Sequence, residues 1–186
     1  MGRKEKYEHA IASYSKAIRV NPRDYRAYNN RGNAYQKKGL YDLSIVDYNL
    51  AIELNPVFDL AYINRGNAYQ KKGQYDLATT DYDKAIELNP KNDMAYNNRG
   101  FNLILMGKYT EAERDIEEAL QLNPSNIYAL NSMAELFAAK KDVIEACRWL
   151  RKAVAKGYNN WSYIKTSETY DNIRKAQSFQ EIVAGK

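Results

Sequence analysis

The sequence predicts an all-α solenoid, a linear array of antiparallel helix pairs, and two observations predict it. An Asn-Pro dipeptide recurs every 34 residues, with its proline at Pro22, Pro56, Pro90 and Pro124. The segments between the prolines nearly copy one another, since AYNNRGNAYQKKGLYDLSIVDYNLAIELNP is followed by AYINRGNAYQKKGQYDLATTDYDKAIELNP. Such a period indicates an array of one repeated unit. Its stability comes from the stacking of neighbouring units rather than from one central core.

Each repeat is expected to hold two helices, which a glycine at repeat position 15 separates when Tyr25 is position 1. In the first helix, positions 4, 8 and 11 form one apolar stripe with a glycine at its centre, as Tyr62, Gly66 and Tyr69 show. Glycine costs a helix interior about 1 kcal/mol relative to alanine. We therefore interpret it as the place where the partner helix approaches closely. The second helix ends at the Asn-Pro step, because proline cannot continue it.

These positions resemble the tetratricopeptide repeat family, whose 34-residue pattern has small residues at positions 8, 20 and 27, aromatics at 11, 17 and 24, and proline at 32. The tyrosines at positions 17 and 24 match this pattern: Tyr41, Tyr75 and Tyr109, and Tyr14, Tyr48 and Tyr82. The resemblance implies a right-handed superhelical solenoid and a noncatalytic role in binding other proteins. It divides the chain into complete repeats at 25–58, 59–92 and 93–126 and a divergent repeat at 127–160.

Both ends depart from the pattern. Residues 1–24 align with positions 11 to 34 alone, so we expect a truncated first repeat that keeps its second helix. The lone helix is either a cap or the edge of a longer array, and the initial Met-Gly favours the longer array. Residues 161–186 are expected to form C-terminal capping helices, in which Ser178 and Glu181 have the spacing of a capping box. Their apolar residues would cover the last open face: Trp161, Ile164, Ile173, Phe179 and Ile182.

Composition excludes some functions and locations. The formal charge is +5, but residues 93–126 hold three basic and six acidic residues, so the continuous basic stripe of an RNA-binding protein is interrupted. No apolar run approaches the roughly 20 residues of a membrane span, and no signal peptide opens the chain. Cys147 is the sole cysteine, which excludes a disulfide within the chain and favours a reducing, cytoplasmic location.

One set of charged residues follows the repeat and is predicted to be structural. Position 7 is arginine and position 23 is aspartate in the three complete repeats: Arg31 with Asp47, Arg65 with Asp81, and Arg99 with Asp115. In the divergent repeat both positions change together, to Met133 and Trp149. Joint replacement is what contact between the two helices of one repeat predicts, so we expect three structural ion pairs.

The sequence contains no arrangement that predicts catalysis. His9 has no carboxylate or cysteine at ligand spacing, and no glycine-rich loop has the spacing of a nucleotide motif. The acidic run 111–120 is read as a solvated helix face rather than a metal site. We therefore predict no enzyme activity, no catalytic residue, no metal and no cofactor.

Removing the apolar stripe from each first helix leaves positions 2, 6, 9 and 13 on the opposite side, which in this family lines the concave groove. In the complete repeats these residues are Arg26, Asn30, Asn33, Lys37, Leu60, Asn64, Asn67, Lys71, Met94, Asn98, Phe101 and Leu105. The divergent repeat adds Tyr128, followed by Ser132, Glu135 and Ala139.

The asparagines of this face suggest how a ligand would be held. An asparagine amide offers a donor and an acceptor, which match the two groups of a peptide bond. The ladder resembles those by which some tetratricopeptide superhelices grip extended peptides, and the alternative is that the amides are solvated or bond between repeats. Phe101 and Leu105 introduce apolar residues that are either anchors for a partner or packing for the last repeat.

The function predicted from the sequence is therefore a noncatalytic scaffold that binds an extended or helical segment of a partner protein in the concave groove. The alternative is a self-associating assembly module in which the first helix pairs with another copy through Tyr7, Ile11, Tyr14 and Ile18. RNA binding is less favoured, because the basic residues do not form one continuous surface.

Overall fold

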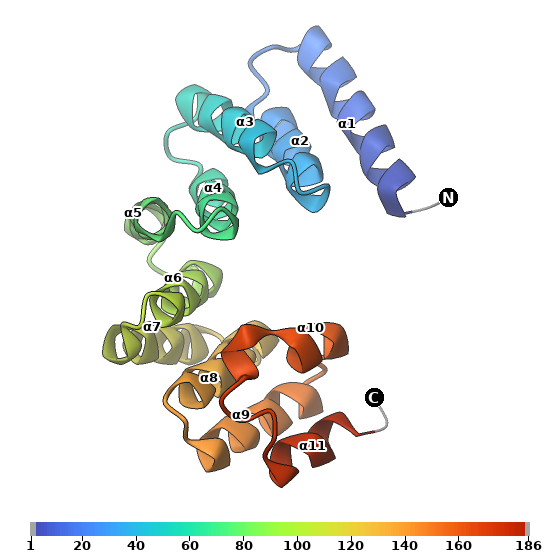
Figure 1. The fold of residues 1–186 in the computed structure, drawn as a ribbon. Coiled ribbons are helices and arrows are strands. Elements are labelled where there is room, and N and C mark those ends of the chain that lie inside the picture. The colour runs from blue at the N-terminus through green and yellow to red at the C-terminus, as the bar shows by residue number, and fades with distance from the viewer. Residues whose placement is uncertain (1–2, 185–186) are drawn as a thin grey trace. The chain divides into compact units, whose positions relative to one another are not determined.

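The computed structural model describes residues 3–184, and all their regular structure is helical (Figure 1). Residues 3–88 form α1 (Arg3–Val20), α2 (Tyr25–Lys37), α3 (Tyr41–Leu54), α4 (Asp59–Lys71) and α5 (Tyr75–Leu88). They are followed by α6 (Asp93–Leu105), α7 (Tyr109–Leu122), α8 (Ile127–Ala139) and α9 (Val143–Ala155). The chain ends with α10 (Trp161–Thr166), the 3-10 turn η1 (Glu168–Tyr170) and α11 (Gln177–Val183). The predicted all-α class is confirmed.

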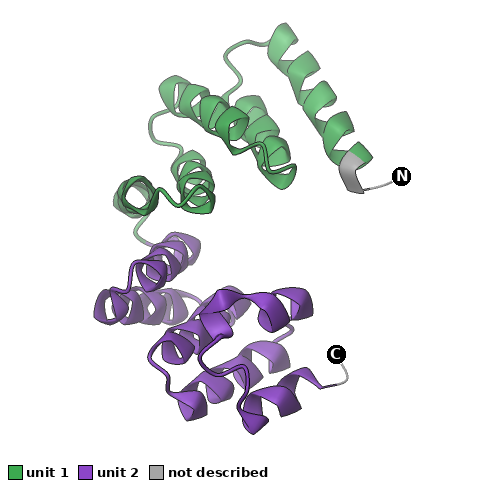
Figure 2. Ribbon diagram, in the orientation of Figure 1, with its two compact units in different colours: residues 1–90 green, residues 91–186 purple. Residues whose placement is uncertain are grey.

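The chain forms two compact units, residues 1–90 and 91–186 (Figure 2). In the first unit α2 pairs with α3 and α4 with α5, while α1 packs on α2 and α3 packs on α4. In the second unit α6 pairs with α7 and α8 with α9, and α8 also contacts α6 and α7. Within each unit, the two helices of a repeat thus pack side by side, as expected for an array of helix pairs.

The helix ends follow from local sequence. Gly39, Gly73 and Gly107 have φ between 72° and 77°, a left-handed conformation that glycine adopts without a steric cost. Lys141 takes this conformation in the divergent repeat, with φ 63°. Several first helices of the repeats begin at a side-chain cap, as at Asn92, whose amide oxygen accepts from the backbone N–H groups of Met94 and Ala95.

The glycine at position 8 makes room for the aromatic residue at position 24. A Cβ atom placed on Gly32 would lie 2.7 Å from Cε1 of Tyr48, and one on Gly66 would lie 2.7 Å from Cε1 of Tyr82. In the third complete repeat a Cβ on Gly100 would lie 2.7 Å from Cγ1 of Ile116, and in the divergent repeat position 8 is alanine and position 24 is Leu150. Close helix packing therefore explains a glycine that helix propensity alone disfavours.

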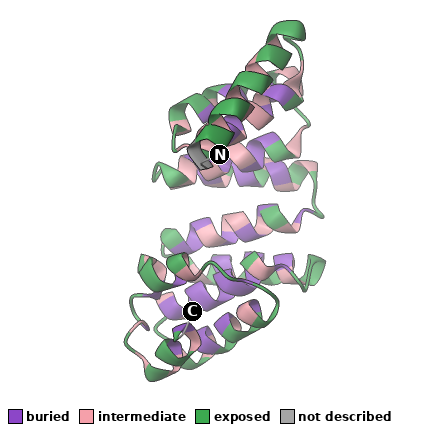
Figure 3. Cartoon of the chain, turned by 90° about the vertical axis from the view of Figure 1, so that its right-hand side faces the viewer, coloured by how far each residue is buried: buried purple, intermediate pink, exposed green. Residues whose placement is uncertain are grey.

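Most buried residues lie on the helix faces that meet a neighbouring helix, whereas α1 is largely exposed (Figure 3). The C-terminal segment packs on two helices, with η1 against α8 and α11 against α9. Of its expected covering residues, Ile164, Ile173 and Phe179 are buried, while Trp161 and Ile182 are partly buried against the same cluster. The cap therefore covers a face of α8 as well as α9.

The predicted capping box at Ser178 is wrong. Helix α11 begins at Gln177 and its N-cap is Ala176, which makes no side-chain cap hydrogen bond. Ser178 lies inside the helix, where its hydroxyl is 3.4 Å from the Cys147 sulfur. The reason is that packing against α9 sets the start of this short helix, rather than the local capping pattern.

Candidate functional site

In the first unit, the predicted groove residues lie on α2 and α4 and are all half-buried or exposed. Helix α2 contributes Arg26, Asn30, Asn33 and Lys37, and α4 contributes Leu60, Asn64, Asn67 and Lys71. Lys37, Lys71 and Arg26 are exposed, and the Arg26 guanidinium lies 4.7 Å from the ring centre of Tyr25. This face therefore combines amides with cations and carries no acidic residue among the eight.

Two asparagines of this face retain hydrogen-bonding capacity. The Asn64 side chain donates from Nδ2 to Oδ1 of Asn29, at 2.9 Å, across adjacent repeats. Its second amide hydrogen and its own oxygen bond to no other described residue, and the Asn30 side chain makes no hydrogen bond within residues 3–184. Asn64 therefore forms a hydrogen bond between repeats, which is one of the two predicted roles of these asparagines. Its remaining amide donor and acceptor match the groups of a peptide backbone, which is the other predicted role.

Asn33 and Asn67 have a structural partner instead. The Tyr48 hydroxyl lies 2.7 Å from Oδ1 of Asn33, and the Tyr82 hydroxyl donates to Oδ1 of Asn67 at 2.8 Å. Burial raises the pKa of both tyrosines, which keeps their hydroxyls protonated as donors. In the next repeat, Ile116 and Phe101 replace this tyrosine and asparagine together. These amide oxygens therefore serve the helix pair.

In the second unit, α6 presents an apolar face. Met94 and Leu105 are exposed, while Phe101 is partly buried against the core cluster of α6, α7 and α8. Tyr128 on α8 is 64% exposed, and its ring packs edge-on against Tyr158 with the centroids 6.1 Å apart. Asn98 is half-buried on α6. Met94, Leu105 and Tyr128 are thus available to a partner, whereas Phe101 also contributes to packing.

The sequence prediction that Ser132 and Glu135 line the groove is wrong. Both are buried. Helix α8 packs against η1, and Tyr163 of α10 and Thr169 of η1 both bond to Glu135. Glu135 accepts hydrogen bonds from the Tyr163 hydroxyl, from Thr169 Oγ1 at 2.7 Å and from Asn131 Nδ2 at 2.8 Å. A glutamate within the apolar helix 127–139 was the sequence signal for a buried network, and the periodic pattern did not reveal it.

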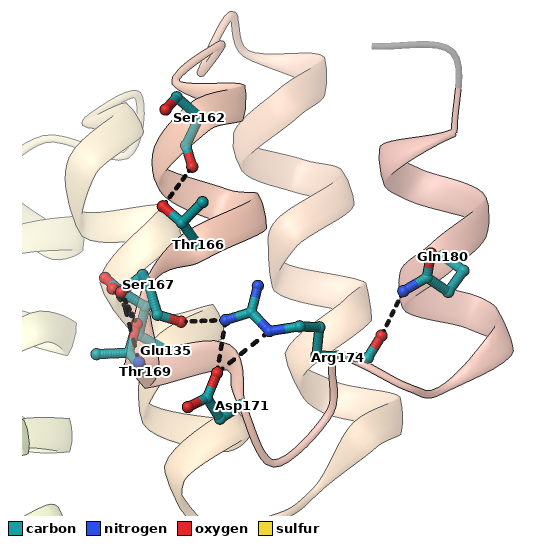
Figure 4. Close-up of polar contacts among 8 residues, drawn as sticks. All are labelled: Glu135, Ser162, Thr166, Ser167, Thr169, Asp171, Arg174 and Gln180. Carbon is teal, nitrogen blue, oxygen red and sulfur yellow. Dashed lines mark hydrogen bonds and ion pairs between the residues drawn. The ribbon is translucent and has the colours of Figure 1, made fainter.

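The covering segment is held by its own hydrogen bonds (Figure 4). Figure 4 shows Thr169 beside Glu135, and Arg174 directed at the loop that carries Ser167 and Asp171. The Arg174 Nη2 atom donates to the Ser167 carbonyl and to the Asp171 carboxylate, both at 2.6 Å. The part of this α8 face around Glu135 is therefore already occupied by the chain itself, whereas Tyr128 remains exposed.

The arginines at position 7 and the aspartates at position 23 meet between the two helices of each complete repeat. Each arginine donates from Nε and from Nη2 to the two carboxylate oxygens of its aspartate, at 2.6 to 2.8 Å: Arg31 to Asp47, Arg65 to Asp81 and Arg99 to Asp115. Bidentate pairs of this kind are strong and geometrically specific. In the divergent repeat, Met133 is buried and Trp149 packs on the same cluster.

Within residues 3–184, no three His, Cys, Asp or Glu side chains are grouped closely enough to hold a metal ion. His9 is exposed on α1, and Cys147 is a buried free thiol. None of the described helices has the length and hydropathy needed to cross a membrane.

Comparison with known proteins identifies the repeat. A family model of the tetratricopeptide repeat matches residues 25–58, 60–92 and 94–126, and a further TPR repeat model matches residues 3–39. No curated protein matches the sequence.

Solved structures share the fold. The crystal structure of TTC0263, described as a thermophilic TPR protein in Thermus thermophilus, matches with a TM-score of 0.75 and 21% identity over 85% of this chain and 87% of that one. YrrB, described as a TPR protein with an unusual peptide-binding site, matches with a TM-score of 0.62 and 21% identity. The match covers 91% of this chain and 88% of YrrB. The first TPR of Spaghetti (RPAP3), bound to the HSP90 peptide SRMEEVD, matches with a TM-score of 0.59 and 30% identity. The match covers 62% of this chain and 92% of that one.

Proposed function

Because the chain belongs to the tetratricopeptide repeat family, we propose that it is a noncatalytic scaffold that binds an extended or helical segment of a partner protein on the exposed faces of its first helices. The observation that carries the proposal is the pair Asn30 and Asn64. Both lie at repeat position 6 on α2 and α4, half-exposed, with unused amide donors and acceptors. Such amides match the N–H and C=O groups of a peptide backbone.

The two units would contribute differently. The first unit offers the amides together with Lys37 and Lys71, which favour a backbone next to acidic side chains. The second unit offers Met94, Leu105 and Tyr128, which suit an apolar anchor of the partner. The peptide complex of Spaghetti and the peptide-binding site of YrrB support this use of the fold. A free Cys147 supports a reducing compartment, and we propose a cytoplasmic location.

The groove proposal predicts two separable losses of affinity. Peptides would be selected from a random display library on the intact chain, and their binding measured by calorimetry. For peptides that use the first unit, Asn30→Ala with Asn64→Ala should weaken binding about thirty-fold whatever the side chains, because each of the two lost hydrogen bonds contributes about 1 kcal/mol. For peptides with an apolar anchor, Met94→Lys with Leu105→Lys should cost about 2 kcal/mol or more.

Controls on the second helices separate the faces. Val46 on α3 and Ile144 on α9 are also exposed apolar residues, so Val46→Lys and Ile144→Lys should leave the affinities unchanged. All of these positions are exposed or half-buried, so circular dichroism should show intact folding. If the groove variants bind as tightly as the unaltered chain while a control variant loses affinity, the binding surface lies on the second helices.

A second candidate function is self-association through α1, and it is favoured by the exposure of Ala17. The alanines at the same repeat position in the second helices of the complete repeats are fully buried: Ala51, Ala85 and Ala119. On α1, Tyr14 is half-buried, whereas Tyr48 and Tyr82 at the same repeat position are buried. Tyr7, Ile11 and Ile18 are also half-buried.

Self-association predicts that molar mass rises with concentration. Light scattering over a wide concentration range should show dimers, and Ala17→Glu should shift the equilibrium to monomer, because a charge would then lie within the apolar contact. Lys16→Glu, an exposed change next to it, is the matched control. Monomers at every concentration would exclude this function and leave the groove proposal untouched.

A further inference from the structure

A pocket of about 510 Å³ lies in the second unit, between α7, α8 and α9, away from the groove residues. It is lined by Leu120, Pro124, Leu130, Trp149, Lys152, Ala155 and Lys156. This volume is within the usual range of ligand sites. We propose that this pocket binds an acidic peptide segment of a partner protein, inserting one bulky apolar side chain while flanking carboxylates meet Lys152 and Lys156.

The pocket exists because the divergent repeat lacks a tyrosine that fills the same place in the second complete repeat. There, the corresponding residue is Tyr62, whose hydroxyl donates to the Pro56 carbonyl at 3.2 Å. Pro56 corresponds to Pro124, and Tyr62 corresponds to Leu130. The leucine is shorter and has no hydroxyl, so it does not reach the loop. The space that Tyr62 fills is left open beside Pro124.

The same comparison between the second and the divergent repeat shows that one wall of the pocket changes from a charged to an aromatic residue. Asp81, which pairs with Arg65 in the second repeat, corresponds to Trp149. The Trp149 ring is partly buried and packs on both core clusters of the second unit. An aromatic wall opposite Leu120 and Leu130 favours an apolar or aromatic side chain in the pocket.

The charge at the mouth also changes. In the second repeat, Lys84 is neutralised by Glu87 at 2.7 Å. Lys152 corresponds to Lys84, but Ala155 replaces the glutamate, and Lys156 replaces Leu88. Neither Lys152 nor Lys156 forms an ion pair with a carboxylate in the part of the chain that the structure describes. Lys152 instead lies with Nζ 4.1 Å from the ring centre of Trp149. Two unmatched cations beside an apolar cavity favour an anionic ligand with an apolar group.

The openness of the site argues for a peptide. Pro124, Lys152, Ala155 and Lys156 are exposed, whereas Leu130 is buried at the floor. A side chain can therefore enter while its backbone passes outside, over the lysines. This site is separate from the proposed groove, since none of its residues belongs to that face.

The test uses the capped pentapeptide EDFDE as probe and the Trp149 indole N–H signal as readout, in NMR titrations of the full chain. The Trp149 signal should shift and saturate with EDFDE, whereas EDADE and KKFKK should leave it unchanged. Ala155→Glu restores the carboxylate that the second repeat has, and we expect it to lower the affinity for EDFDE about three- to five-fold. Ala155→Gln, of the same size without the charge, is the matched control and should keep the affinity.

Leu130→Tyr, which restores the tyrosine of the second repeat, should abolish binding by filling the pocket. Because Leu130 is buried, the Ala155 pair decides the question if that variant does not fold. The inference is overturned if EDADE binds as well as EDFDE, if Ala155→Glu and Ala155→Gln bind equally, or if the Trp149 signal does not move at millimolar peptide. It is also overturned if Leu105→Lys abolishes binding, since the peptide would then occupy the face of α6.

Discussion

Asp81→Ala is expected to lower the free energy of unfolding by about 3 kcal/mol, because it leaves the Arg65 guanidinium without its bidentate partner between α4 and α5. The Asp81 side chain is 5% exposed and that of Arg65 is 20% exposed. Water can therefore reach part of the orphaned guanidinium, which also bonds to Asn49 Oδ1 at 2.7 Å. This places the loss at the lower end of the range for buried pairs. Urea denaturation would measure it.

The double variant Arg65→Met with Asp81→Trp should recover much of this loss, since it reproduces Met133 and Trp149 of the divergent repeat. Burial raises the pKa of Asp81 and Arg65 opposes this rise, so desolvation already offsets much of the attraction within the pair. Replacing both residues with apolar ones removes the two charges and also the free-energy cost of burying them away from water. If the double variant is no more stable than the sum of the single changes predicts, the two residues are not energetically coupled.

Glu135→Ala is expected to destabilise the second unit by about 3 kcal/mol or more. Three donors converge on this buried carboxylate: the Tyr163 hydroxyl, Thr169 Oγ1 and Asn131 Nδ2. Each buried donor that loses its acceptor costs about 1 to 3 kcal/mol. Because Tyr163 and Thr169 belong to the segment that covers α8, its docking should weaken first. Hydrogen exchange of residues 161–176 and chemical denaturation would both detect this.

Two variants make the Glu135 experiment specific. Glu117→Ala changes an exposed glutamate of α7 and should leave stability nearly unchanged. Glu135→Gln keeps the size of the side chain and one acceptor oxygen, so it should lower the free energy of unfolding less than Glu135→Ala does. Equal stability of Glu135→Ala and Glu117→Ala would show that the hydrogen bonds do not hold the cap on α8.

Helix pairing and helix ends could be predicted from the sequence because they repeat. Each contact within a repeat occurs several times, so a comparison of units shows which positions change together. The glycine and tyrosine of positions 8 and 24 become Ala134 and Leu150, and the arginine and aspartate of positions 7 and 23 become Met133 and Trp149. The period also predicted the first-helix faces on which Asn30, Asn64 and Leu105 are half-buried or exposed.

A contact that occurs once in the chain cannot be found by comparing repeats. Only the tertiary structure reveals it. The cap buries Glu135 because η1 packs on α8, a contact that no other repeat contains among the described residues. The amide oxygens of Asn33 and Asn67 bond to tyrosines from the neighbouring helix, although helical rotation places them on the same face as Asn30 and Asn64. Helical periodicity specifies the side of a helix on which a residue lies. Whether that side meets water, a partner or another part of the chain depends on packing between elements that are distant in sequence.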